Sequence, residues 1–374
     1  MKKKHVNEIS FLRSVACLSI VLLHSIVWGM EYIGFLSDLP SYSKILLDSI
    51  TVFLYYGTPT FIFITAFILG FSYREKGEIS EGFLTKRLKF ILIPYLFMAI
   101  LYATPYSLVS VEQFLLKIVL NIFIGDFHAY FVLIIFQFYL LFVLFKKWLD
   151  TYSPIRVILF SLFVNVMYLS FFNFTNPIDI IFSEYIWDRF YWIPFPGWIF
   201  YFSLAYYIGC HYRAFTYYIT RYRTCVLVAP FLTGILLLYL YHSGLITIHS
   251  SKRIDILFHT LSVIVFVLFV SRKMKTIPSL FLSINKYSYG IYLLHTCFMS
   301  LLILLFRYFS FNLGIFTIVI LFVGSTVASM GTVYYLNRFS FGKYIVGKVN
   351  IKHSSVPPVS SKSIYVNTNN TSSS

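Results

Sequence analysis

Charged residues are scarce in this chain. Only 12% of its 374 residues are Asp, Glu, Lys or Arg, whereas soluble domains average about 25%. A chain that is 59% hydrophobic, with a mean hydropathy of +0.78, cannot be a soluble enzyme of ordinary composition. The composition predicts a polytopic integral membrane protein, and its long apolar runs predict an all-α fold.

Cysteine is also rare, and its spacing excludes two kinds of site. The four cysteines, Cys17, Cys210, Cys225 and Cys297, lie in or beside apolar runs and form no C-x-x-C pair. This pattern is typical of small packing residues and argues against a disulfide framework or a zinc site. No H-E-x-x-H, Walker or G-x-S-x-G pattern stands where it would matter, so we expect no metal and no nucleotide-hydrolysing site.

Acidic residues are the scarcest charged class, with 14 against 30 lysines and arginines. The net charge of +16 would suit a nucleic-acid partner, but the positions of the basic residues argue against one. Ten apolar segments, each near the length that crosses about 30 Å of hydrocarbon, can be counted at 9–30, 45–72, 88–110, 127–146, 154–173, 196–212, 223–243, 255–272, 286–306 and 314–337.

With a cytoplasmic N-terminus, 23 lysines and arginines fall on the inner side of these segments and six on the outer side. Such a bias fixes the orientation of a membrane protein and accounts for the high isoelectric point. The sequence therefore predicts a multi-pass membrane protein, with both termini cytoplasmic and no nucleic-acid partner. Residues 1–350 form its transmembrane domain, and the polar residues 351–374 form a disordered cytoplasmic tail.

The first apolar segment carries two ionisable residues that lipid tolerates poorly. Arg13 and His24 are eleven residues apart, which places them on one helical face, about 16 Å apart along the axis. A satisfied histidine and a snorkelling arginine would be one explanation. Ionisable residues inside the membrane more often serve function, so we expect this face to line a polar cavity. A neutral imidazole there could act as a general base on a hydroxyl group.

Two further groups of residues are candidates for binding. Arg74, Lys86, Arg87 and Lys89 cluster on the predicted inner side and could hold phosphates, although topology alone would also place basic residues there. The predicted outer loop 174–198 is rich in rings and carboxylates that would suit a sugar polymer, or that would form an interfacial aromatic belt. Its candidates are Glu184, Trp187, Asp188 and Trp192.

Four stretches resemble the acyltransferase family 3 membrane proteins. Residues 8–24 look like the first span of that family, with its basic residue and its histidine at Arg13 and His24. Residues 83–95, 197–202 and 286–295 are similar to three later spans, although Lys86 and Lys89 stand where the family has two arginines. Residues 57–61, 130–131 with 137–138, and 197–202 also resemble the intercellular-adhesion group of poly-N-acetylglucosamine biofilm systems.

The resemblance implies an O-acyltransferase of a bacterial plasma membrane. Such an enzyme takes an acetyl or succinyl group from cytoplasmic acyl-CoA and transfers it to hydroxyls of an extracytoplasmic polysaccharide. Arg13 would orient the donor, and His24 would take the acceptor's proton or carry the acyl group itself. His295 would be a partner of His24, or else a satisfied core histidine. The basic cluster would bind acyl-CoA. A polysaccharide exporter is the alternative, and the polysaccharide synthase is a possible partner in either case.

Overall fold

A computed structural model describes residues 6–32, 39–74, 78–311 and 313–349. The predicted tail at 351–374 lies outside these residues. The longer helices begin and end as follows: α1 Asn7–Tyr32, α2 Ser41–Leu54, α3 Gly57–Tyr73, α5 Ile93–Leu101, α6 Val111–Ile124, α7 Phe131–Thr151, α8 Pro154–Phe174, α10 Ile199–Cys210, α11 Tyr212–Arg221, α12 Arg223–His242, α13 Ile256–Lys273, α14 Ser279–Tyr308 and α15 Phe316–Leu336.

Short helical turns join these helices: α4 Phe83–Arg87, η1 Leu88–Leu92, η2 Thr104–Leu108, η3 His128–Tyr130, α9 Ser183–Asp188, η4 Phe190–Trp192, η5 Phe195–Gly197 and α16 Gly342–Ile345. The described part of the chain contains no strand. The prediction of an all-α membrane protein is therefore confirmed.

Each of the ten predicted segments contains a helix. Nine helical stretches in the described residues are long and apolar enough to cross a membrane. The remaining segment, 196–212, holds α10, whose 12 residues extend only about 18 Å. This helix is therefore shorter than the predicted span, because the chain bends after Cys210 and continues as α11.

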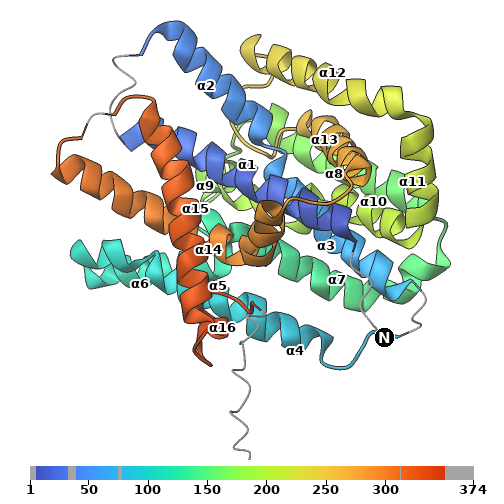
Figure 1. The fold of residues 1–374 in the computed structure, drawn as a ribbon, viewed down its shortest axis with the longest axis horizontal. Coiled ribbons are helices and arrows are strands. Elements are labelled where there is room, and N and C mark those ends of the chain that lie inside the picture. The colour runs from blue at the N-terminus through green and yellow to red at the C-terminus, as the bar shows by residue number, and fades with distance from the viewer. Residues whose placement is uncertain (1–5, 33–38, 75–77, 312, 350–374) are drawn as a thin grey trace, which may run out of the picture.

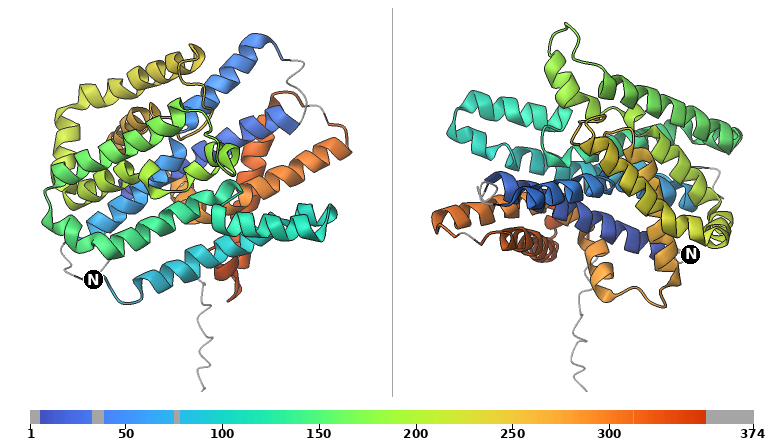
Figure 2. Two further views of the ribbon diagram at one scale, coloured as in Figure 1. Left: turned by 180° about the vertical axis from the view of Figure 1, so that it is seen from behind. Right: turned by 90° about the horizontal axis from the view of Figure 1, so that it is seen from above.

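Helix α1 lies in the middle of the bundle (Figure 1). It packs against α3, α13, α14 and α15, and two thirds of its apolar stretch is buried, compared with 22% for the peripheral helices α8 and α12. The two further views in Figure 2 show the same central position. Arg13 and His24 therefore lie on a helix that is surrounded by protein, as the cost of placing them in lipid requires.

Two glycines allow α3 and α10 to approach each other closely. A Cβ atom on Gly70 would lie 2.0 Å from the Tyr206 carbonyl oxygen, and one on Gly209 would lie 2.3 Å from the Phe67 carbonyl oxygen. Small residues let membrane helices pack backbone against backbone, where dispersion contacts replace the hydrophobic effect. This contact holds the short α10 in the core.

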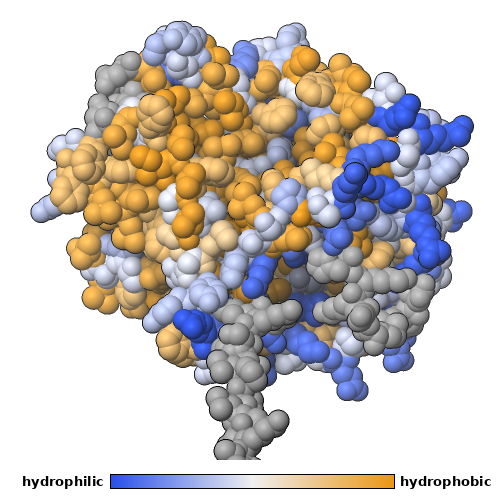
Figure 3. Space-filling model, in the orientation of Figure 1, coloured by the Kyte–Doolittle hydropathy of each residue, from blue (hydrophilic) through white to orange (hydrophobic). Residues whose placement is uncertain are grey.

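The surface shows how the bundle meets its surroundings. In Figure 3, apolar side chains cover most of the visible face, and hydrophilic side chains gather at the edge where α11 lies. That edge includes the exposed residues Arg213, Arg221 and Arg223, which belong to the side predicted to be cytoplasmic. A broad apolar surface that ends in a basic rim is the pattern expected of a multi-pass membrane protein.

The α3–α10 contact gives a stability prediction. We expect Gly209→Ala to lower the thermal midpoint of the purified protein by several degrees, because the new methyl group must displace the backbone at Phe67. Gly331→Ala in α15 is the control, since a Cβ atom there meets nothing within 4 Å. Equal midpoints for the two variants in detergent would contradict the role of the contact.

Candidate active site

Two histidines from distant parts of the chain meet beside α1. The Nδ1 atom of His24 lies 2.8 Å from the Nε2 atom of His295 in α14. Their rings stack with centroids 5.0 Å apart and an interplanar angle of 17°. The structure therefore places these two predicted catalytic residues in direct contact across the α1–α14 interface.

The hydrogen-bond pattern assigns the tautomer of each ring. The His295 Nδ1–H donates to the carbonyl oxygen of Ile291, at 2.9 Å. In a neutral ring this leaves His295 Nε2 as an acceptor, so His24 must donate its Nδ1–H to it. The unprotonated nitrogen of His24 is then Nε2, which hydrogen-bonds to no described residue. This is the arrangement that a general base needs, because an oriented imidazole presents a free lone pair.

A third histidine completes the cluster. The ring of His128, in η3, lies edge-on to His295 with centroids 5.2 Å apart. Its Nε2–H donates to the Tyr292 carbonyl oxygen at 3.1 Å, and its Nδ1 lies 3.0 Å from the Thr296 hydroxyl. These contacts link the His128 ring to helix α14 and to His295. Within the described residues, no group of three or more His, Cys, Asp or Glu side chains is placed to hold a metal ion.

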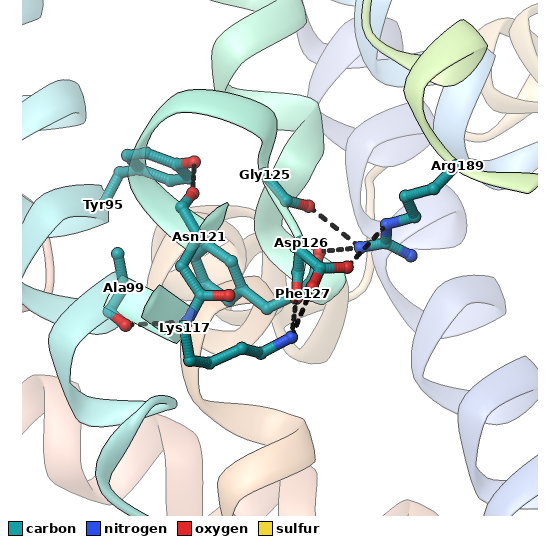
Figure 4. A network of polar contacts seen from close by, with 8 residues as sticks. All are labelled: Tyr95, Ala99, Lys117, Asn121, Gly125, Asp126, Phe127 and Arg189. Atoms are coloured by element: carbon teal, nitrogen blue, oxygen red, sulfur yellow. Dashed lines mark hydrogen bonds and ion pairs between the residues drawn. The ribbon is translucent and has the colours of Figure 1, made fainter. Parts of the chain in front are cut away.

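A polar network fixes the connection between α6 and α7 that carries His128 (Figure 4). Lys117 donates to the side chain of Asp126 at 2.6 Å, and Arg189 forms an ion pair with the same carboxylate at 3.3 Å. The Arg189 guanidinium also donates to the carbonyl oxygens of Gly125 and Phe127, each at 2.9 Å. The α9–η4 region is thereby joined to the loop that positions His128.

The same network reaches α5. The Asn121 side-chain amide donates to the Ala99 carbonyl oxygen at 2.8 Å, and the Tyr95 hydroxyl donates to the Asn121 carbonyl oxygen (Figure 4). Gly125 ends α6 with a positive φ of 63°, a backbone conformation that glycine adopts without steric cost. Asn121, fully buried in the bundle, therefore ties the end of α6 to its neighbour.

A cavity of about 450 Å³ opens beside His24. It is lined by α1 residues from Ile20 to Trp28, by Asp126 and His128, and by residues of the loops before α10 and α13. At its rim, His249 Nε2 lies 2.8 Å from the Asp48 carboxylate, and His249 Nδ1 lies 2.5 Å from the Tyr55 hydroxyl. Helix α1 contributes His24, whereas the turns and loops predicted to lie outside contribute His128, His249 and most of the other polar lining.

The predicted sugar-binding residues lie at different distances from this cavity. Trp192 lines it. Trp187 packs on the rings of Phe171 and Phe172, and its indole N–H donates to the Thr175 carbonyl oxygen. Glu184 and Asp188 are exposed, and neither lines the cavity. Binding of a polysaccharide by any of the four stays a prediction.

Arg13 occupies a separate environment on the predicted inner half of α1. The cavity beside His24 reaches Ile20 and does not include Arg13. The Tyr139 hydroxyl lies near both Arg13 and Arg87. The guanidinium carbon of Arg87 lies 3.8 Å from the Phe83 ring centroid and 5.3 Å from that of Tyr139. Two of the residues predicted to contact the donor therefore lie near one tyrosine.

The rest of the predicted donor cluster is more open to solvent. Arg74, Lys86 and Lys89 are all exposed. No described residue forms an ion pair with Arg13 or Arg87 within 4.0 Å.

Comparison with known proteins identifies the family of this chain. A family model described as the acyltransferase domain matches residues 6–335. The chain belongs to this acyltransferase family. It is therefore a membrane acyltransferase, and the resemblance seen in the sequence is confirmed.

Individual relatives extend over nearly the whole chain. A Bacillus subtilis (strain 168) protein, YfiQ, named as a membrane-bound acyltransferase, is 36% identical over 350 residues, covering 92% of this chain and 95% of the relative. A Staphylococcus aureus (strain Mu50) protein named as a poly-beta-1,6-N-acetyl-D-glucosamine export protein is 27% identical, covering 92% of this chain and 97% of the relative. A Staphylococcus epidermidis protein of the same name is 26% identical over 354 residues. No solved structure gave a significant match.

The ion-pair network generates a prediction about its central carboxylate. We expect Asp126→Asn to destabilise the protein by about 1.5–3 kcal/mol, because Lys117 and Arg189 lose a charged hydrogen-bond partner. Denaturation in detergent, followed by intrinsic fluorescence, measures the change. Asp179→Asn is the control, because Asp179 is exposed and lies outside the network. A loss for Asp179→Asn equal to that for Asp126→Asn would contradict the assignment.

Proposed function

We propose that this membrane acyltransferase transfers an acetyl or succinyl group from acyl-CoA to a hydroxyl group of a cell-surface polysaccharide. The observation that supports this most is the hydrogen bond between His24 Nδ1 and His295 Nε2. It leaves His24 Nε2 unprotonated beside a cavity that a sugar hydroxyl could enter. General-base removal of the hydroxyl proton by such a group contributes about 10²–10⁴-fold to a rate.

His295 acts on the reaction through His24. Its Nδ1–H bond to the Ile291 carbonyl oxygen fixes the ring, and its Nε2 holds the Nδ1–H of His24. When His24 accepts a proton, the imidazolium retains this hydrogen bond and is stabilised by it. His295 is thus a positioning residue, and His24 is the base.

The donor would enter from the opposite membrane side. Arg13 and Arg87, which both lie near Tyr139, would hold the phosphates of acyl-CoA. The pantetheine arm of the donor would carry the thioester along α1, over the roughly 16 Å between Arg13 and His24. The cavity beside His24 ends at Ile20, so this path requires the inner half of the bundle to open when the donor binds. The acceptor would approach through the cavity at the other end. Donor and acceptor therefore need not share one compartment.

Export of a polysaccharide is a second candidate function, supported by the names of the staphylococcal relatives. An exporter needs a path for the whole polymer, whereas the cavity beside His24 reaches only Ile20. An enzyme needs the free lone pair that the hydrogen-bond pattern assigns. We therefore place acyl transfer first.

His24→Ala separates these two functions. We expect the variant to lose at least about 10²-fold in acylation of the surface glycan, because the proton acceptor is gone, while polymer still reaches the surface. Mass spectrometry of cell-surface glycan measures acylation, and binding of a lectin to whole cells measures export.

His211→Ala is the matched control, since His211 is exposed and does not line the cavity. Intact acylation with loss of surface polymer in His24→Ala cells would contradict the enzyme and favour the exporter. We expect His295→Ala to lose acylation less severely than His24→Ala, because the base remains but is no longer oriented.

The donor site can be tested separately. We expect Arg13→Ala and Arg87→Ala each to weaken binding of acetyl-CoA or succinyl-CoA to the purified protein about tenfold or more, because each removes a charge-assisted hydrogen bond. Arg221→Ala, at an exposed position on α11, is the control. Unchanged affinity in both site variants, measured by calorimetry, would place the donor elsewhere.

A further inference from the structure

Lys252 is a buried cation without a carboxylate partner. Its exposed fraction is 4%, and no carboxylate of the described chain forms an ion pair with it within 4.0 Å. Burying an ammonium group without a counterion is costly, so such groups are rare unless they serve a function. Lys252 lines the same cavity as His24.

Aromatic rings and backbone contacts hold Lys252 in place. Its Nζ atom lies 3.2 Å from the Trp192 ring centroid and 4.7 Å from that of Tyr130. Its backbone N–H donates to the Ser250 hydroxyl at 3.2 Å, and its carbonyl oxygen accepts from the Asn173 side chain at 3.1 Å. Cation–π contacts offset part of the desolvation cost but leave the positive charge in place. The ammonium is therefore preorganised.

The charges around Lys252 do not neutralise it. Asp126 is the carboxylate that lines the cavity, and both Lys117 and Arg189 already pair with it. The imidazoles that line the cavity are those of His24, His128 and His249. The phenol ring of Tyr130 contacts the Lys252 ammonium. Burial, and then the positive charge of Arg189, lower the pKa of Lys252 well below its ordinary value.

His24 and Lys252 line the same cavity. A base and a buried lysine amine therefore face one space, and no carboxylate of the described chain pairs with that lysine. Acyl transfer creates an anion at such a place, because attack on the acyl carbonyl puts a negative charge on its oxygen. Preorganised positive groups that meet this charge supply a large part of catalysis in many enzymes.

We propose that Lys252 is a further catalytic residue of the acyl transfer, and that it stabilises the oxyanion of the tetrahedral intermediate. The inference rests on the proposed function. The acceptor hydroxyl oxygen bonds to the thioester carbon while its proton passes to His24 Nε2. The carbonyl oxygen takes the negative charge beside the Lys252 ammonium. The C–S bond then breaks, the carbonyl re-forms, and the CoA thiolate takes the proton from imidazolium His24.

Acylation by the full-length protein in lipid nanodiscs tests this role. The donors are acetyl-CoA and succinyl-CoA, and the acceptor is a β-1,6-linked N-acetylglucosamine oligosaccharide. We expect Lys252→Met to lower kcat about 10²-fold with little change in KM for either donor, because one stabiliser of the transition state is removed. Lys252→Arg keeps the charge and should retain more activity. Lys44→Met is the control, since Lys44 lies on α2 and does not line the cavity.

The pH profile gives a readout that a purely structural lysine would not move. Oxyanion stabilisation requires the protonated amine, so activity should be present below the pKa of Lys252 and lost as the pH rises through it. Because that pKa is lowered, activity should begin to fall at a pH below the ordinary lysine pKa of about 10.4. In Lys252→Arg the fall should move to higher pH, since arginine stays protonated.

Each outcome decides a separate point. Full activity in folded Lys252→Met, or a raised KM with unchanged kcat, would overturn the catalytic role. An unchanged alkaline limb in Lys252→Arg would overturn it as well. A wild-type protein that transfers neither group would instead contradict the proposed function. Thermal unfolding of each variant in the same nanodiscs identifies any loss that comes from misfolding.

Discussion

The hydrogen bond between His24 and His295 is the interaction on which the account of this protein depends. It joins α1 to α14 through two imidazole rings inside the bundle, where an unpaired polar group would cost several kcal/mol. It satisfies one nitrogen of His24 and leaves the other free. Because His295 is held by the carbonyl oxygen of Ile291, the direction of both bonds is fixed. Packing around α1 therefore sets the chemistry of the cavity.

The main features of the fold and part of the site were predictable from the sequence. Long apolar runs reveal membrane helices because hydrocarbon satisfies no backbone hydrogen bond. The eleven-residue spacing of Arg13 and His24 placed both on one face of a helix that could not face lipid. The structure places His24 beside a cavity that mixes apolar side chains with polar and charged ones, and this cavity ends at Ile20 and does not include Arg13. A linear pattern shows which face a residue shares, and it does not show how far a cavity extends.

Helical periodicity in the sequence could not predict which loop residues reach the site. His128 reaches the cluster through a three-residue turn, and Lys252 reaches the cavity on an irregular loop. One signal was nevertheless present. Lys117, Arg189 and Lys252 are three of the six basic residues that the orientation rule places outside, and all three belong to the network or the cavity. Basic residues that oppose the bias need a specific reason to be there.

Nitrogen-15 NMR of the histidine side chains, in wild-type protein and in the His295→Ala variant, tests the central claim most directly. The account predicts that His24 at neutral pH is an uncharged ring, protonated at Nδ1 and bare at Nε2, and that this tautomer loses its preference when His295 is removed. A His24 ring protonated at Nε2, or a tautomer ratio unaffected by the loss of His295, would contradict the account.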